Sequence, residues 1–191
     1  MLDIIIDTRE KNKLVTNWLP KQFPDVNFSF KTLQEGDFQS KSCIIERKSI
    51  DVLWNSIHDG RFRTQVSRIC THQCDKVVMY LILGSVDDYI AKMNNFHIKI
   101  DEDLIHGAVS SLLIRDNIRV LCYSNEKQGL KQMVKSIKKI EEEGVLNFQS
   151  SRDCDMLMAR ILNVPKTTWF NIKDVHGSSL SHLCTLSAKE F

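Results

Sequence analysis

The sequence predicts an α/β domain in which helices cover both faces of a central sheet. Val77 to Leu83 is a continuous apolar run of strand length, which is typical of a strand buried on both faces. Segments with the helical spacing of apolar residues alternate with short β-rich runs over most of the chain. A hydrophobic fraction of 42% in 191 residues also suffices for one core of ordinary size.

The first part of the chain predicts short elements around a turn. They are a strand over Leu2–Ile6, a helix around Leu14–Leu19, a half-buried strand over Val26–Phe30, a turn at Gly36-Asp37 and a strand over Cys43–Ile45. Pro20 and Pro24 are expected to end the helix. The β-rich run leads directly into Glu46-Arg47-Lys48.

Helices dominate the next part. Expected are helices over 50–57 and 62–70 with a break at Asp59-Gly60, the buried strand 77–83, a helix over 104–113, a strand over 118–122, and a long helix over 126–143 closed by Gly144. These elements make a domain of roughly 145 residues. We place it at 1–146, with a polar linker at 147–154 and a separate helical segment at 155–191.

The long helix carries two faces of interest. Its apolar stripe must be buried either on its own sheet or on a partner, and the sequence favours neither; it consists of Leu130, Met133, Val134, Ile137 and Ile140. Lys131, Lys135, Lys138 and Lys139 form a basic face. Because Glu141 to Glu143 follow directly, a solvated face is favoured over a DNA-binding patch.

Composition excludes several classes of protein. The balance of 26 basic and 24 acidic residues gives a net charge of +2, so a nucleic-acid site must come from local clustering. No apolar run is long enough to span a bilayer, so no membrane partner is expected. No signal peptide fits the N-terminus, and the cysteines are expected to be reduced. We expect an intracellular protein, nuclear if its source is eukaryotic and otherwise cytoplasmic.

Acidic residues follow the predicted strands and indicate a metal site. Asp7 and Glu10 come after the first strand, Asp37 stands at a turn, and Glu46 lies on a later strand. Carboxylates that converge repel one another, and a hard cation such as Mg²⁺ removes that cost. Lys48 lies two residues beyond Glu46, so both side chains point to one face of a strand. This set suits metal-assisted phosphodiester hydrolysis.

The same residues resemble a known family. GDF at 36–38, followed by ERK at 46–48 and by Asp51, resembles the GD…ERK…D signature of XPF-type structure-specific endonucleases. DTRE at 7–10 is similar to the family's earlier acidic motif. SIHDGRF at 56–62, together with Gln65, is closest to the crossover-junction branch, which cuts forks and flaps. The resemblance implies a restriction-endonuclease-like fold, a central mixed sheet flanked by helices.

The resemblance also implies roles for individual residues. Mg²⁺, for which Mn²⁺ can substitute, would be held by Asp7, Glu10, Asp37, Glu46 and the backbone carbonyl of Arg47. Lys48 would contact the attacking water or the phosphate, and these six residues form the expected catalytic set. Contacts with DNA are expected from Arg9, Arg61, Arg63 and Gln65.

Two parts of the pattern leave alternatives open. Only two residues separate Lys48 from Asp51, where the family often has three, and Asp51 equally fits an acid that interacts with a helix dipole. In Asp59-Gly60-Arg61-Phe62, a plain turn between helices with Phe62 in the core competes with a phosphate-binding role.

The tail at 155–191 resembles the first half of a tandem helix-hairpin-helix module, which in XPF-type nucleases binds DNA and dimerises. Asn163-Val164-Pro165 replaces the usual hairpin glycine, and the chain stops at the start of another helix. The resemblance therefore implies a homodimer, or a heterodimer with a related nuclease subunit.

The predicted activity is metal-dependent hydrolysis of DNA near branch points, in forks, flaps or intermediates of repair and recombination, with 5′-phosphate and 3′-hydroxyl products. One alternative is a catalytically inactive subunit that positions DNA. The presence of the whole acidic set argues against it. The other alternative is a related nuclease with a different DNA substrate.

Overall fold

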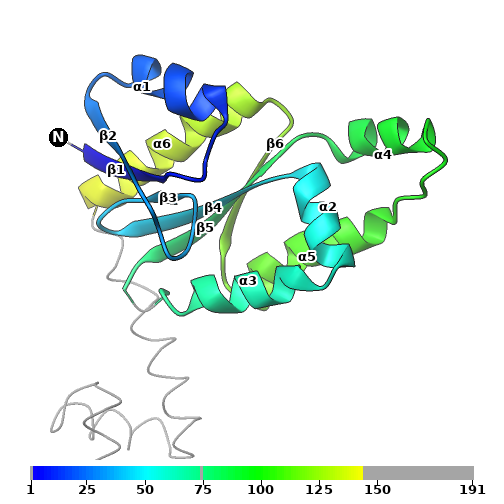
Figure 1. Ribbon diagram of the computed structural model, residues 1–191. Helices are drawn as coiled ribbons and strands as arrows, with labels where there is room; N and C mark the ends of the chain where they lie inside the picture. The colour runs from blue at the N-terminus through cyan, green and yellow to red at the C-terminus, as the bar shows by residue number, and fades with distance from the viewer. Residues whose placement is uncertain (1, 74, 144–191) are drawn as a thin grey trace, which may run out of the picture. The chain divides into compact units, whose positions relative to one another are not determined.

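The computed structural model describes residues 2–73 and 75–143, which form a six-stranded mixed sheet between two layers of helices (Figure 1). The strand order is β2-β1-β3-β4-β5-β6. The strands are β1 (Leu2–Asp7), β2 (Val26–Lys31), β3 (Phe38–Gln39), β4 (Cys43–Ser49), β5 (Val77–Leu83) and β6 (Arg119–Tyr123). The fold class expected from the sequence is confirmed.

All strands run in one direction except β3, which is antiparallel to both β1 and β4. The carboxyl ends of the other five strands therefore lie at one edge of the sheet, and β3 begins at that same edge. We call it the carboxyl edge. Residues that follow β1, lie near the end of β4 or precede β3 are brought together there, as is usual for ligand sites of α/β sheets.

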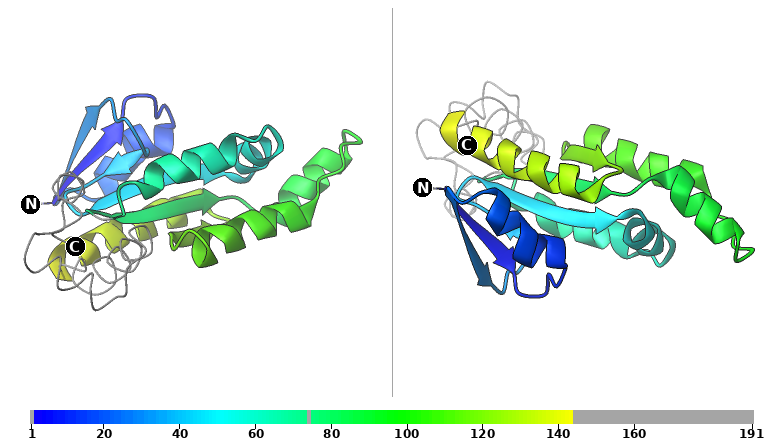
Figure 2. Two further views of the ribbon diagram at one scale, coloured as in Figure 1. Left: turned by 90° about the horizontal axis from the view of Figure 1, so that it is seen from below. Right: turned by 90° about the horizontal axis from the view of Figure 1, so that it is seen from above.

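Helices cover both faces of the sheet (Figure 2). They are η1 (Leu14–Trp18), α1 (Leu19–Gln22), α2 (Ile50–His58), α3 (Arg61–Cys70), α4 (Val86–Asn94), α5 (Glu102–Ile114) and α6 (Glu126–Glu143). One core lies between the sheet and η1, α1 and α6. The other lies between the sheet and α2, α3 and α5, and α4 packs at its margin. Every residue of β5 is buried, as expected for a strand covered on both faces.

The apolar stripe of α6 lies on the protein's own sheet. Leu130, Met133, Val134 and Ile137 are fully buried and pack against residues of β1, β3, β4 and β5. This settles the alternative that the sequence left open, because the stripe has no surface to offer a partner. It gives no support to dimer formation.

Three local features differ from the sequence-based expectation. Pro20 does not end the first helix: it lies in the first turn of α1, where its missing N–H has no partner to lose, and the segment begins as the π-helical turn η1. Helix α4 and strand β3 have no counterpart in that expectation. Helix α4 buries none of its residues fully, and β3 is too short to show an alternating pattern.

Gly36 makes the turn that brings Asp37 to the carboxyl edge. Its φ is +77°, and a Cβ there would lie 2.8 Å from Ile44 Cγ1 and 3.1 Å from the Ile45 carbonyl oxygen. Backbone hydrogen bonds from Asp37 N to Ile45 O (2.8 Å) and from Asp7 N to Asp37 O (2.9 Å) fix the turn between β1 and β4.

Gly36→Ala should lower the free energy of unfolding by about 2–4 kcal/mol, because left-handed strain adds to a clash with a packed strand. Urea denaturation measures this effect. Gly60→Ala is the matched control, since Gly60 has φ +74° but no atom within 4 Å of the added Cβ. That variant should lose only the conformational part, about 1 kcal/mol. Equal losses in the two variants would contradict the packing argument.

The chain divides into two units at 1–146 and 147–191. The predicted linker, the helix-hairpin-helix-like segment and the closing Gly144 lie outside the described residues. Among the helices of the described part, none has the length and apolar character needed to cross a membrane.

Candidate active site

The carboxyl edge brings together the side chains that the sequence singled out. Asp7 ends β1, Asp37 directly precedes β3, and Glu46, Arg47 and Lys48 lie near the end of β4. Because side chains alternate along a strand, Glu46 and Lys48 lie on the face covered by α2, α3 and α5, and Arg47 lies on the α6 face. The site therefore has two parts, one on each side of the sheet.

The first part is the carboxylate pair Asp37 and Glu46. Burial and then the nearby charge of Glu46 raise the pKa of Asp37 to about 7. Asp37 Oδ2 accepts a hydrogen bond from the backbone N–H of Arg47 at 2.7 Å. Glu46 Oε1 accepts one from Lys48 Nζ at 3.1 Å. Among the described residues, Asp37 Oδ1 and Glu46 Oε2 accept no hydrogen bond, so each carboxylate keeps one oxygen for a ligand.

Lys48 is the buried cation of this part. Its side chain is only 3% exposed, and Glu46 is its ion-pair partner. The attraction between the two charges offsets part of the cost of taking the ammonium out of water. Lys48 is therefore held next to the place where an anionic substrate group would meet the carboxylate pair.

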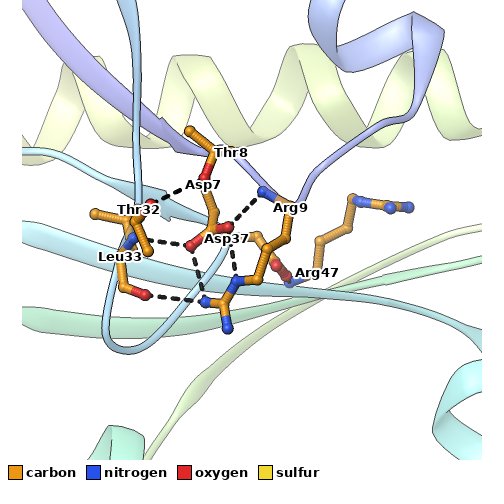
Figure 3. Close-up of polar contacts among 7 residues, drawn as sticks. All are labelled: Asp7, Thr8, Arg9, Thr32, Leu33, Asp37 and Arg47. Carbon is orange, nitrogen blue, oxygen red and sulfur yellow. Dashed lines mark hydrogen bonds and ion pairs between the residues drawn. The ribbon is translucent and has the colours of Figure 1, made fainter.

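Asp7 is closed off by Arg9 (Figure 3). Asp7 Oδ1 accepts hydrogen bonds from the backbone N–H and Nε of Arg9 (2.6 and 2.8 Å), and Oδ2 accepts them from Arg9 Nη2 and the Leu33 N–H (2.8 and 2.9 Å). The paired Arg9 guanidinium, helped by the backbone donors, holds the pKa of this buried carboxyl far below its usual value. Asp7 can reach a metal only if Arg9 releases it.

Glu10 is likewise engaged, on the other face of the sheet. Its Oε2 accepts from Arg47 Nε (2.8 Å) and its Oε1 from the Asn12 N–H (2.8 Å). Glu126, the first residue of α6, lies 3.5 Å from Arg47 Nη1 and accepts a hydrogen bond from Asn12 Nδ2 (2.6 Å). Figure 3 shows Arg47 pointing away from Asp7 and Arg9. Glu10 and Glu126 thus hold the Arg47 guanidinium.

The donor set fits a hard divalent cation at Asp37 and Glu46 rather than at a ready cluster of four carboxylates. Within residues 2–73 and 75–143, no three His, Cys, Asp or Glu side chains converge in metal-binding geometry. Two carboxylates with unengaged oxygens, one with a raised pKa, suit Mg²⁺, which keeps several waters and needs few protein ligands.

The four residues expected to contact DNA differ in exposure and in the partners that they contact. Arg9 and Arg61 are exposed, and Arg61 pairs with its neighbour Asp59. Arg63 instead forms a bidentate pair with Asp116, with both N–O distances 2.9 Å, and so ties α3 to the loop before β6. Gln65 Oε1 is buried without a hydrogen-bond partner among the described residues.

Phe62 and Asp51 bear on the two alternatives left open. Phe62 is buried against Tyr80, as expected if residues 59–62 form a plain turn between helices with Phe62 in the core. Asp51 is exposed in the first turn of α2. No contact joins it to Asp37 or Glu46 in the described part of the chain, so its position suits the helix dipole better than the carboxylate pair.

Sequence reasoning missed Asn12 and Glu126, which complete the support of Arg47. A signal was present for Glu126: it follows the strand predicted over 118–122, and the carboxyl ends of parallel strands meet at one edge. Nothing in the sequence marks Asn12, because its role depends on how the chain between Glu10 and η1 folds back.

Comparisons with known proteins identify the family and the fold of this chain. Residues 6–136 match the ERCC4 domain. XPF from Aeropyrum pernix in complex with DNA superposes with a TM-score of 0.59 at 23% identity, covering 100% of this chain and 88% of that one. A second structure of XPF from Aeropyrum pernix gives 0.58 at 22% identity, covering 99% and 88%. No curated protein sequence matches. The match to the ERCC4 domain includes every motif residue at the carboxyl edge, and the chain belongs to this family of XPF-type nucleases.

Proposed function

We propose that this protein is a divalent-metal-dependent DNA endonuclease that cuts near branch points. The observation that carries the proposal is the pair of Asp37 and Glu46, each with an unengaged oxygen, beside the buried Lys48. Family membership supports DNA as the substrate, since the Aeropyrum pernix relative is described in complex with DNA. The crossover-junction branch rests on the segment at 56–62 and remains a prediction.

Each residue at the edge has a distinct part in this chemistry. Asp37, Glu46 and the backbone carbonyl of Arg47 would hold Mg²⁺ or Mn²⁺. A bound divalent cation supplies an acidified water and neutralises charge on the phosphate. The Lys48 ammonium orients the phosphate or the water, and its contact with Glu46 keeps it in place. Arg9, whose side chain is 68% exposed, faces solvent where a DNA backbone can approach.

Asp7 and Glu10 have a conditional role in metal binding. Their carboxylates are engaged by Arg9 and Arg47, so they support the site in the observed arrangement. Either one joins the metal only after its arginine turns to DNA. The dimer expected from the sequence stays a prediction, because the α6 stripe does not argue for it and the tail lies outside the described residues.

Lys48→Ala should slow cleavage about a hundredfold, the usual loss when one preorganised donor to the reacting group is removed, while metal affinity stays within a few-fold. Protonated lysine has no lone pair and cannot be a ligand. Single-turnover cleavage and calorimetric titration with Mn²⁺ measure the two effects. Lys48→Met keeps the apolar stem buried and checks that the fold survives. Loss of Mn²⁺ binding in a folded Lys48 variant would contradict the role of Lys48 as a non-ligand.

A substrate panel tests the function itself. A fork, a flap and a plain duplex of one sequence are incubated with Mg²⁺ and, separately, with chelator. Cleavage of fork or flap only with metal supports the proposal. Equal cleavage of the plain duplex points to a related nuclease with another substrate. Binding without cleavage of any substrate points to an inactive DNA-positioning subunit.

A further inference from the structure

A row of lysines runs along α6 from the carboxyl edge. Lys127, Lys131, Lys135 and Lys139 follow one another at intervals of four residues, which places them on one side of the helix over about 18 Å. We call this row the lysine ridge. Lys127, Lys131 and Lys135 are exposed. Every successive pair in the ridge is a like-charge pair, and such pairs destabilise a helix.

Trp18 of η1 holds two of these lysines together. Lys127 Nζ and Lys131 Nζ lie 5.7 and 5.6 Å from the centroid of the same indole ring. Each contact is a cation–π interaction, and together they keep two ammonium groups close to each other. The arrangement concentrates positive charge where an isolated helix would spread it.

The neighbouring segments add to this charge. Residues 11–24 and 126–140 carry eight lysines and a single acidic residue, Glu126, although the whole chain has a net charge of only +2. Lys138 is paired with Asp25. The local excess is the clustering that a nucleic-acid site needs in a nearly neutral protein.

The ridge starts at the active site. Glu126, which contacts the Arg47 guanidinium, directly precedes Lys127, and the Arg47 N–H binds the Asp37 carboxylate. A polyanion lying on the ridge therefore reaches the carboxyl edge within one turn of α6.

We propose that the lysine ridge and Trp18 form a track for the sugar-phosphate backbone of the DNA arm that leaves the cleavage site. This inference rests on the proposed function, since it takes DNA as the occupant. An anionic membrane is the less suitable partner, because a helix that lies on a membrane needs a free apolar face. The apolar face of α6 is buried on the sheet. The sequence alone disfavoured a DNA-binding role for the basic face formed by Lys131, Lys135, Lys138 and Lys139, which shares three lysines with the ridge.

The test is the binding of a fluorescein-labelled fork and of the unforked duplex to the full chain in chelator, as a function of salt. The variant is Lys127→Gln/Lys131→Gln/Lys135→Gln. We expect the variant to bind both DNAs about tenfold more weakly than the parent. The slope of log K against log salt concentration should be less steep by about two to three. Its melting temperature should be unchanged or higher, because like-charge pairs are removed.

Two further variants sharpen the result. Lys41→Gln/Lys92→Gln/Lys99→Gln removes the same charge from exposed positions elsewhere and should keep the parental salt slope. Trp18→Leu leaves the charges but frees the two ammonium groups, so affinity should fall only about two- to fivefold. Equal effects of the two triple variants, an unchanged slope in the ridge variant, or binding to phosphatidylserine vesicles but not to DNA would each overturn the inference.

Failure of the inference is distinguishable from failure of the proposed function. Binding is measured without metal and does not depend on cleavage. A parent protein that binds DNA through the ridge but never cuts leaves the track in place and removes the nuclease. If the parent cuts forks but the ridge variant binds DNA normally, the nuclease function stands and the DNA track is ruled out.

Discussion

Asp37→Asn and Glu46→Gln should each lower the rate of DNA cleavage by about a hundredfold or more while DNA binding in chelator is kept. Each substitution removes one ligand of the proposed two-carboxylate metal site, and loss of transition-state charge stabilisation of this kind amounts to at least a few kcal/mol. Single-turnover cleavage with Mg²⁺ measures the rate, and fluorescence anisotropy measures binding. A near-normal cleavage rate for Glu46→Gln would contradict the assignment of Glu46 as a metal ligand.

The control for this pair is Glu35→Gln. Glu35 lies two residues before Asp37 and pairs with Arg68 at 3.3 Å, so the change is of the same type but outside the site. It should leave the cleavage rate within about twofold of the parent, as expected for a surface substitution.

We also expect Asp37→Asn to raise the free energy of unfolding, although it lowers activity. Burial and the charge of Glu46 raise the pKa of Asp37 to about 7, above its unfolded value near 4, so ionising it destabilises the metal-free fold. In chelator at about pH 8, Asp37→Asn should therefore be more stable than the parent. The gain should shrink as the pH falls below about 7 and vanish below about 4. Urea denaturation across this range measures it.

Asp7→Asn should lower the free energy of unfolding at neutral pH by about 2–3 kcal/mol. The buried carboxylate accepts four hydrogen bonds, two on each oxygen, from Arg9 and Leu33. An amide offers only one acceptor oxygen, and its nitrogen would face either the Leu33 N–H or the Arg9 guanidinium, donor against donor. Urea denaturation in chelator measures the loss.

The effect of Asp7 also has a definite pH dependence. Because pairing with Arg9 holds its pKa far below the unfolded value, the stabilisation is complete above about pH 4 and is lost as the pH falls below that. The variant and the parent should therefore converge in acid. Asp3→Asn, an exposed change on the same strand, should stay within about 0.5 kcal/mol of the parent. An Asp7→Asn protein as stable as the parent at neutral pH would show that the Arg9 pairing is not a structural anchor.

The tertiary structure adds most to the sequence at the acidic residues. From order and spacing, Asp7, Glu10, Asp37 and Glu46 form a single metal-binding group. In the fold, Arg9 and Arg47 engage the first two and leave the last two with unengaged oxygens. Spacing along a chain shows which residues reach an edge. It does not show which neighbour neutralises each charge, because those neighbours come from separate segments.

The elements with a local pattern can be predicted from the amino-acid sequence. The all-buried strand β5, the helices α2, α3, α5 and α6, and the alternation that puts Glu46 and Lys48 on one face follow from periodicity. The motif residues and their order also sufficed to assign the family. Periodicity depends on residues a few positions apart, and motif order is read along the chain, so no knowledge of contacts between distant segments was needed.

The positions of the functional residues on the two faces of the sheet follow from the fold and not from local sequence patterns. The reversal of β3 brings Asp37 to the carboxyl edge, and the burial of the α6 stripe on the sheet turns the lysine ridge outward beside Trp18. The link from Arg47 through Glu126 joins residues 79 positions apart in the chain. Charge pairing and burial of this kind depend on contacts between distant segments, and those contacts exist only once the whole sheet has formed.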